Sequence, residues 1–256
     1  MKIIETHCHL DYLKQLPLEE IVQKCKEVGI EKIITIGVAP ENLDTVFEIS
    51  NNNDLIYFSQ GIHPHDAKDS SKEAMEKISQ RTSEEKMVAV GEIGLDYHYD
   101  NSPRKVQLAV FEEQLQIAVD KKKPVIIHSR DADDDMIAML NEYAPKLDKK
   151  GVIHSFTSTR ALAKKAIDEG FYLGFNGIIT FKKAEEVREN VVYAPIENLL
   201  IETDSPFLTP VPHRGKENAP YYLPFILEKM AELKNLSPEV AAKHFYENSM
   251  NLFFRT

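Results

Sequence analysis

The chain has 256 residues, of which 43% are hydrophobic and 28% charged, and these proportions exclude a fibrous or a disordered protein. Its 41 acidic side chains outnumber 31 basic ones, and the formal charge of −10 excludes broad electrostatic attachment to nucleic acid or to anionic lipid. Apolar runs are far shorter than a membrane span and 2 cysteines make no disulfide framework, so we expect a cytoplasmic protein with no leader and no membrane contact.

Short runs rich in isoleucine, valine and phenylalanine alternate with amphipathic stretches along the chain. We predict strands over residues 2–4, 32–36, 55–60, 87–90, 124–128, 151–154, 171–175 and 199–202. The clearest predicted helices cover residues 18–28, 104–121, 132–143, 159–169 and 184–192. The pattern therefore indicates eight strands, each followed by a helix.

The predicted strands are continuous apolar runs, which are typical of parallel strands covered on both faces. Eight such units in a chain of this length favour a (β/α)8 barrel that forms a single domain over residues 1–256, although a doubly wound open sheet has the same alternation. Polar residues distinguish the two folds. Glu92, His128, His154 and Asp204 come at or just after the carboxyl ends of their strands, where a barrel keeps its active site.

The first apolar run ends in two histidines that are one residue apart, His7 and His9. Side chains at positions i and i+2 of a strand leave the same face, so both imidazoles point toward one place. Cys8 lies between them and faces the other way, and we expect a packed thiol there. The pair predicts a metal-binding site.

Six nitrogen and oxygen ligands at one barrel mouth are enough for two divalent cations with a carboxylate between them. We predict that one cation binds His7, His9 and Asp204, that the other binds His128 and His154, and that Glu92 bridges them.

Each of these residues has an alternative structural role. His128 and His154 could be strand-end histidines that bond to backbone groups, and Glu92 could accept bonds at the end of a helix. Asp204 could cap a helix within the segment E-T-D-S-P at 202–206. Equivalent placement of all six residues after strands favours a shared site.

The chain resembles the TatD family of metal-dependent hydrolases along nearly its whole length. The resemblance is carried by I-I-E-T-H-C-H-L-D at 3–11, G-I-H-P-H at 61–65, G-E-I-G-L-D-Y at 91–97, P-V-I-I-H-S-R-D-A at 124–132 and L-L-I-E-T-D-S-P at 199–206. The chain departs from the family at Glu5, where the family usually has aspartate, and we expect the longer side chain to reorient His7 slightly.

The resemblance implies a divalent-cation-dependent deoxyribonuclease, a 3′ to 5′ exonuclease on single-stranded DNA and in some members on RNA. It implies the same six metal ligands and leaves magnesium, manganese and zinc open as the cations. Asp204 is the candidate acceptor of the proton of the attacking water, and Glu92 would hold the two cations together. No protein partner is evident.

Three further residues are candidate substrate contacts. Arg130, two residues past His128, could donate a bidentate fork to a phosphate. His63 and His65 form a second i, i+2 pair and could contact phosphate or sugar, or they could be turn residues around Pro64.

Two other functions fit the same residues. The first is hydrolysis of an amide or lactone, or deamination, because related barrels carry those reactions at the same mouth. Many such relatives bridge their metals with a modified lysine after the fourth strand, where this chain has Glu92. The second is a metal-binding scaffold without catalysis, in which the metal only stabilises the fold.

Overall fold

The computed structural model describes residues 1–255. Eight parallel strands neighbour one another in chain order around one sheet. They are β1 (Ile3–Cys8), β2 (Ile30–Gly37), β3 (Ile56–Gln60), β4 (Met87–Asp96), β5 (Val125–Arg130), β6 (Gly151–Ile153), β7 (Tyr172–Phe175) and β8 (Leu199–Ile201). The eight predicted strands are confirmed.

The sheet curls until the segment after β8 meets β1. The Thr6 hydroxyl donates to the carbonyl of Ile201 at 2.9 Å, and the amide of Asp204 donates to the carbonyl of His7 at 2.9 Å. The amide of His9 donates to the carbonyl of Ser205 at 2.8 Å. These bonds nearly close a barrel, so the predicted (β/α)8 fold is confirmed and an open doubly wound sheet is excluded.

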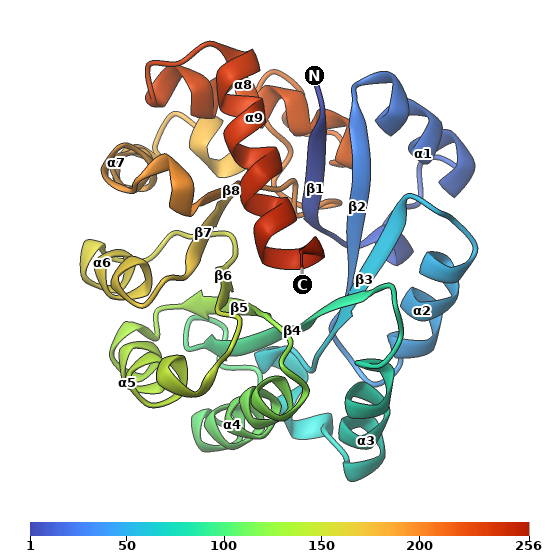
Figure 1. The fold of residues 1–256 in the computed structure, drawn as a ribbon, viewed down its shortest axis with the longest axis vertical. Helices are drawn as coiled ribbons and strands as arrows, with labels where there is room; N and C mark the ends of the chain where they lie inside the picture. Colours follow the sequence, from blue (N-terminus) through green and yellow to red (C-terminus); the bar gives the residue numbers. More distant parts are fainter. Residues whose placement is uncertain (256) are drawn as a thin grey trace.

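Helices follow the strands and form an outer ring around them (Figure 1). Those of the described residues are α1 (Leu18–Glu27), α2 (Leu43–Asn51), α3 (Lys72–Arg81), α4 (Arg104–Lys121), α5 (Asp133–Tyr143), α6 (Arg160–Asp168), α7 (Glu185–Tyr193), α8 (Leu223–Leu233) and α9 (Pro238–Ser249). The expectation of one helix per strand is wrong at β8, because α8 and α9 both follow it. Ser71, Thr159 and Ser237 cap α3, α6 and α9 by accepting a backbone N–H.

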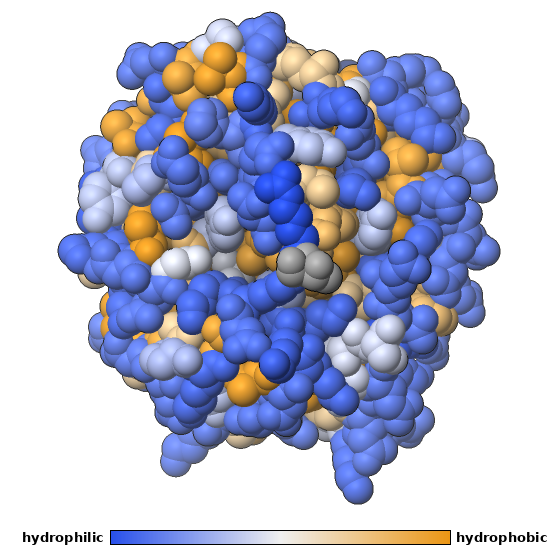
Figure 2. All heavy atoms as spheres, viewed as in Figure 1, coloured by the Kyte–Doolittle hydropathy of each residue, from blue (hydrophilic) through white to orange (hydrophobic). Residues whose placement is uncertain are grey.

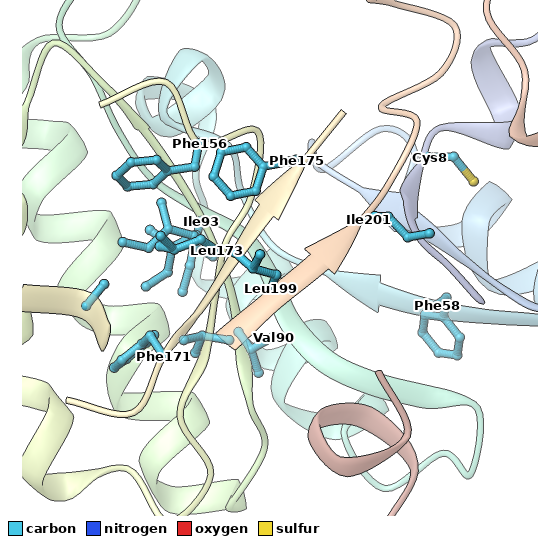
Figure 3. Close-up of a cluster of buried hydrophobic side chains, with 14 of the residues drawn as sticks. Cys8, Phe58, Val90, Ile93, Phe156, Phe171, Leu173, Phe175, Leu199 and Ile201 are labelled. Atoms are coloured by element: carbon cyan, nitrogen blue, oxygen red, sulfur yellow. The ribbon is translucent and has the colours of Figure 1, made fainter. Parts of the chain in front are cut away.

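Alternation along the strands divides the core into two layers. Ile33 and Ile127 belong to the large cluster between sheet and helices, whereas their neighbours Ile34 and Ile126 belong to a smaller cluster inside the barrel. Figure 3 shows part of the large cluster, in which the rings of Phe156 and Phe175 lie close to each other with centroids 6.1 Å apart. Cys8 is fully buried in that cluster, as we expected for a thiol packed in the core.

The chain's last turn, a π-helical segment over Met250–Phe254, continues α9 and lies across the middle of the ring of strands (Figure 1). Leu252 and Phe253 are buried there against the inner cluster. This end of the barrel is therefore closed by apolar packing. Its outer face carries mostly hydrophilic residues, with apolar ones in small separate patches (Figure 2), and no helix within residues 1–255 is long and apolar enough to cross a membrane.

The strands extend further than the apolar runs predict. We expected Glu92 to follow its strand and His128 to end its strand, but Glu92 lies inside β4, and β5 continues past His128 to Arg130. Pairing continues past the apolar run because glycines let the two strands approach closely: a Cβ on Gly94, whose φ is +144°, would lie 2.0 Å from the carbonyl oxygen of His128. His7 likewise lies inside β1, while His154 directly follows β6.

Candidate metal centre

The carboxyl ends of the strands surround a cleft of about 610 Å³ that lies opposite the apolar end. Eight of the nine predicted site residues line it, and His7 lies beneath them, fully buried. The lining includes His9, His63, His65, Glu92, His128, Arg130, His154 and Asp204.

One group of candidate ligands comes from β1 and the segment after β8. His7 and His9 point the same way, as the i, i+2 spacing predicts, and their rings are 5.2 Å apart. The Nε2 atoms of His7 and His9 lie 3.8 and 3.6 Å from the same Asp204 oxygen, Oδ1. The Nδ1 of His9 faces the carbonyl of Ile36 at 3.4 Å, which leaves Nε2 with a free lone pair.

Glu92 joins this group to a second one. Its Oε2 lies 3.3 Å from Nε2 of His7. Its Oε1 lies 2.7 Å from Nε2 of His154, 2.9 Å from Nδ1 of His128 and 3.2 Å from Nε2 of His63. A carboxylate with one oxygen toward each group has the arrangement of a bridging ligand.

Two buried carboxylates lie on the far sides of the second group, and neither was predicted from the sequence. Asp96 Oδ2 lies 3.0 Å from Nε2 of His128, and Glu202 Oε1 lies 3.5 Å from Nδ1 of His154. Carboxylates that orient metal-binding histidines are common in metalloproteins. A signal existed, because Asp96 stands four residues after Glu92 and Glu202 two residues before Asp204, which are spacings that keep one strand face.

His63 and His65 resemble each other in sequence and differ in the structure. The Nδ1 of His63 accepts the backbone N–H of His65 at 3.1 Å, so the proton of the neutral ring resides on Nε2. That Nε2–H points at Glu92, so His63 donates to this carboxylate. The three ligand atoms of His63, Glu92 and His128 also lie within 4.8 Å of one another. His65 instead directs Nε2 to Asp96 at 3.0 Å.

The cleft stabilises ionised carboxylates. Burial opposes ionisation of Glu92, but His154, His63 and His128 outweigh it and hold the pKa of Glu92 well below its usual range. Burial also opposes ionisation of Asp204, yet its bond with His9 lowers the pKa of this carboxyl. Burial lowers the pKa of His63 to about 4, so this ring is neutral at pH 7. Glu92 and Asp204 are thus acceptors near neutral pH.

A divalent cation fits this donor set. Both ring nitrogens of His7 are buried and have no hydrogen-bond partner among residues 1–255, and its ring stacks on that of His154 at 3.9 Å. Leaving buried polar atoms unpaired is costly, and a cation between Nε2 of His7 and the carboxylates would satisfy that nitrogen. Imidazole with carboxylate suits zinc or manganese, and carboxylate with water suits magnesium.

Glu5 contacts His7 through the backbone. We expected the longer side chain to reorient His7 slightly, and its carboxyl group accepts the backbone N–H of His7 at 2.9 Å and that of Thr203 at 3.0 Å. It therefore fastens β1 to the segment that carries Asp204. Burial raises the pKa of Glu5 to about 8.

Arg130 and two exposed aromatic side chains stand around the rim of the cleft. Arg130 is the last residue of β5, on the same face as His128 as predicted, and its guanidinium lies 4.9 Å from the ring of Tyr99. It forms no ion pair with any residue of 1–255. Tyr99 and Phe207 line the cleft and are 55% and 51% exposed, which is unusual for aromatic side chains.

Comparison with known proteins places this geometry in a family. The family model described as TatD related DNase matches residues 4–254. The chain belongs to the TatD family. TatD relatives include YabD of Bacillus subtilis, described as an uncharacterized metal-dependent hydrolase, which is 39% identical over 98% of each chain. The deoxyribonuclease Tat-D of Schizosaccharomyces pombe is 33% identical over 91% of this chain and 86% of its own length.

Solved TatD structures agree with the fold. The crystal structure of YjjV, a TatD homologue from Escherichia coli, superposes with a TM-score of 0.91 at 30% identity, over 99% of this chain and 98% of that one. The protein is therefore a metal-dependent hydrolase of the TatD family, as the sequence motifs indicated.

Proposed function

We propose that this TatD protein is a deoxyribonuclease that hydrolyses phosphodiester bonds from the 3′ end of single-stranded DNA, with RNA as a second substrate. The observation that carries the proposal is the Glu92 carboxylate, which joins two sets of imidazole and carboxylate ligands on the floor of an open cleft. Paired cation sites of this kind serve in-line displacement at phosphorus. The name of the fission yeast relative supports the substrate class.

The proposed ligands divide as the distances suggest. Divalent cations bound here, whether magnesium, manganese or zinc, would supply positive charge to phosphate oxygens and would lower the pKa of a bound water. His7, His9 and Asp204 would hold one cation, His128 and His154 would hold the other, and Glu92, which contacts both sets, would lie between them.

The chain's own residues supply the remaining chemistry. Asp204 is ionised at neutral pH and takes the proton of the attacking water. His63 directs its Nε2–H into the cleft and donates to a phosphate oxygen when substrate is bound. Arg130 donates a bidentate pair of hydrogen bonds to a phosphate. Because the chain has a net charge of −10, it needs such a local positive group to hold an anionic substrate.

Two exposed aromatics indicate a single strand rather than a duplex. Tyr99 and Phe207 come from different loops and line the same cleft, where unpaired bases can stack on them. Bases in a duplex are already stacked on each other. The terminal nucleotides of a single strand therefore suit this cleft best.

The test follows the fate of the two ends of a single-stranded DNA. Purified protein is incubated with 5′-labelled and 3′-labelled strands in magnesium, manganese or zinc, and in EDTA. We expect a ladder from the 5′ label and immediate release of mononucleotide from the 3′ label, both abolished by EDTA. Glu92→Gln should lower the rate on the order of 10³-fold, whereas Glu48→Gln, the same change at an exposed position, should leave it unchanged.

Other outcomes would reject the proposal in distinct ways. Release of mononucleotide from the 5′ label first would reverse the polarity, and cutting within the strand would make the enzyme an endonuclease. No cleavage by protein shown to contain metal would move the function to an amide or lactone, and full activity of Glu92→Gln would exclude the bridging role.

A further inference from the structure

Asp96 is a fully buried carboxylate at the end of β4, and every oxygen it offers is used. Oδ2 lies 3.0 Å from Nε2 of His128 and 3.0 Å from Nε2 of His65. Oδ1 accepts the backbone N–H groups of His98 at 3.0 Å and Tyr99 at 2.9 Å. A buried charge with four donors around it is held in one orientation.

Helix α4 fixes the backbone of Asp96 as well. The Gln107 side chain accepts the amide of Asp96 at 2.8 Å and donates to its carbonyl at 3.0 Å. It also donates to the carbonyl of Ser102 at 2.9 Å, which anchors the loop between β4 and α4. The carboxylate is thus positioned by its surroundings before any cation binds.

An ionised carboxylate only accepts hydrogen bonds, so His128 must keep a proton on Nε2. Its Nδ1 is then the ring nitrogen that faces Glu92, at 2.9 Å. His7, His9 and His154 all present Nε2 to the carboxylates of the site instead. His128 alone of these four depends on a partner that selects the less common ligand atom.

We propose that Asp96 is a positioning residue, which fixes His128 as an Nδ1 ligand and thereby sets the affinity of the cation site formed by Glu92, His128 and His154. The inference rests on the proposed metal site but not on the proposed substrate. Loss of a carboxylate behind a metal-binding histidine typically costs about 10–100-fold in metal affinity. The cation held by His7, His9 and Asp204 should not be affected.

Asp96→Asn tests the proposal because an amide has one oxygen and one NH₂, so it cannot accept hydrogen bonds both from the histidine rings and from the backbone N–H groups. If its NH₂ faces the rings, His128 must accept at Nε2 and carry its proton on Nδ1, which cannot then bind a cation. If its oxygen faces the rings, the NH₂ meets the N–H groups of His98 and Tyr99. Either orientation weakens the site, whereas Asp96→Glu keeps the acceptor and should partly rescue it.

His65 provides the matched control. It shares the same Asp96 oxygen but is 28% exposed at the rim and contacts Asp96 rather than Glu92. His65→Ala therefore removes one bond from the carboxylate and leaves the bond to His128 intact. If the loss of any bond in the Asp96 network weakened the cation site, both Asp96→Asn and His65→Ala would show it. If Asp96 acts through His128, only Asp96→Asn should weaken the site.

Calorimetric titration of metal-free protein with zinc and with manganese gives the readout. We expect Asp96→Asn to weaken one binding step about 10–100-fold and to leave the other unchanged, with Asp96→Glu intermediate and His65→Ala equal to wild type. Ring ¹⁵N resonances of the zinc-loaded wild type should show one histidine bound through Nδ1, and Asp96→Asn should lose that pattern. Wild-type affinity at both steps in folded Asp96→Asn would overturn the proposal.

The outcomes separate this inference from the proposed nuclease activity. If wild-type protein binds cations but cleaves no DNA, the proposed substrate is wrong. The difference in metal affinity between wild type and the Asp96 variants would still test the role of Asp96. A lower melting temperature in Asp96→Asn with unchanged metal binding would show a purely structural role and reject the inference. If the Asn variant does not fold, Asp96→Glu replaces it, and an unaltered affinity there at both steps counts against the proposal.

Discussion

The two ends of the barrel are built from the same strands and differ in almost every physical respect. At the amino end, Ile34, Val88 and Ile126 pack with Leu252 and Phe253 into an apolar plug. A few residues later, β4 and β5 present Glu92 and His128, whose side chains are only 4% and 18% exposed. The change from plug to site occurs within two residues on β5, from Ile126 to His128.

The difference shows where stability and chemistry come from. Apolar burial at the plug is favourable at roughly 25 cal/mol for each Å² removed from water. Buried charged groups at the mouth cost free energy unless they are paired, and the unpartnered nitrogens of His7 mark that cost. We therefore expect substitutions at the mouth to change turnover and substitutions at the plug to change stability.

Asp204→Asn should give the largest effect and leave the fold intact. Asp204 has a φ of +56°, and asparagine tolerates this left-handed conformation about as well as aspartate does. The amide cannot take a proton and binds cations weakly, so we expect kcat to fall on the order of 10³-fold. Thermal unfolding of metal-free protein should change by less than about 1 kcal/mol. A large loss of stability in this variant would break the division between the two ends.

Phe253→Ala should act in the opposite way. Its ring is buried in the plug, and truncating a buried phenylalanine costs about 3–5 kcal/mol because a cavity remains. Denaturant unfolding should show this loss, while kcat per folded molecule stays at the wild-type value. Phe254→Ala is the matched control, since Phe254 is only partly buried and packs on Tyr57 with ring centroids 4.8 Å apart. Reduced kcat in the folded fraction of Phe253→Ala would show that the plug and the mouth are coupled.

The sequence predicts the plug end of the fold well and the mouth less completely. Apolar runs mark where strands begin, and α4 has the predicted bounds of 104–121, because burial of apolar residues dictates both. Strand ends are less well predicted. β4 continues six residues beyond its predicted end at Val90, since backbone pairing does not require apolar side chains and Gly91 and Gly94 permit close approach.

The six expected ligands come together in space, which their common place after apolar runs predicted. The spacing of Asp96 and Glu202 places them on the same strand faces as Glu92 and Asp204, but their roles were missed because they depend on which histidine each carboxylate lies against. Only the structure gives those distances. His63 and His65 show the same limit. Their spacing predicts a shared face, but only the bond from the His65 amide to His63 Nδ1 distinguishes a donor from a residue held by Asp96.

Arg130→Ala should produce the smallest of these effects and sharpens the comparison within the mouth itself. Arg130 lines the cleft but lies next to Tyr99 rather than against Glu92, so it reaches bound substrate without touching the proposed cation ligands. We expect KM for single-stranded DNA to rise about 10-fold, or about 1.4 kcal/mol of binding, with kcat changed only slightly. Arg130→Lys should recover part of this loss, because a point charge replaces the planar fork. The effect on KM should shrink as salt rises, since an exposed charge is screened. A fall in kcat with unchanged KM would instead place Arg130 on the transition state, beside Asp204 and Glu92.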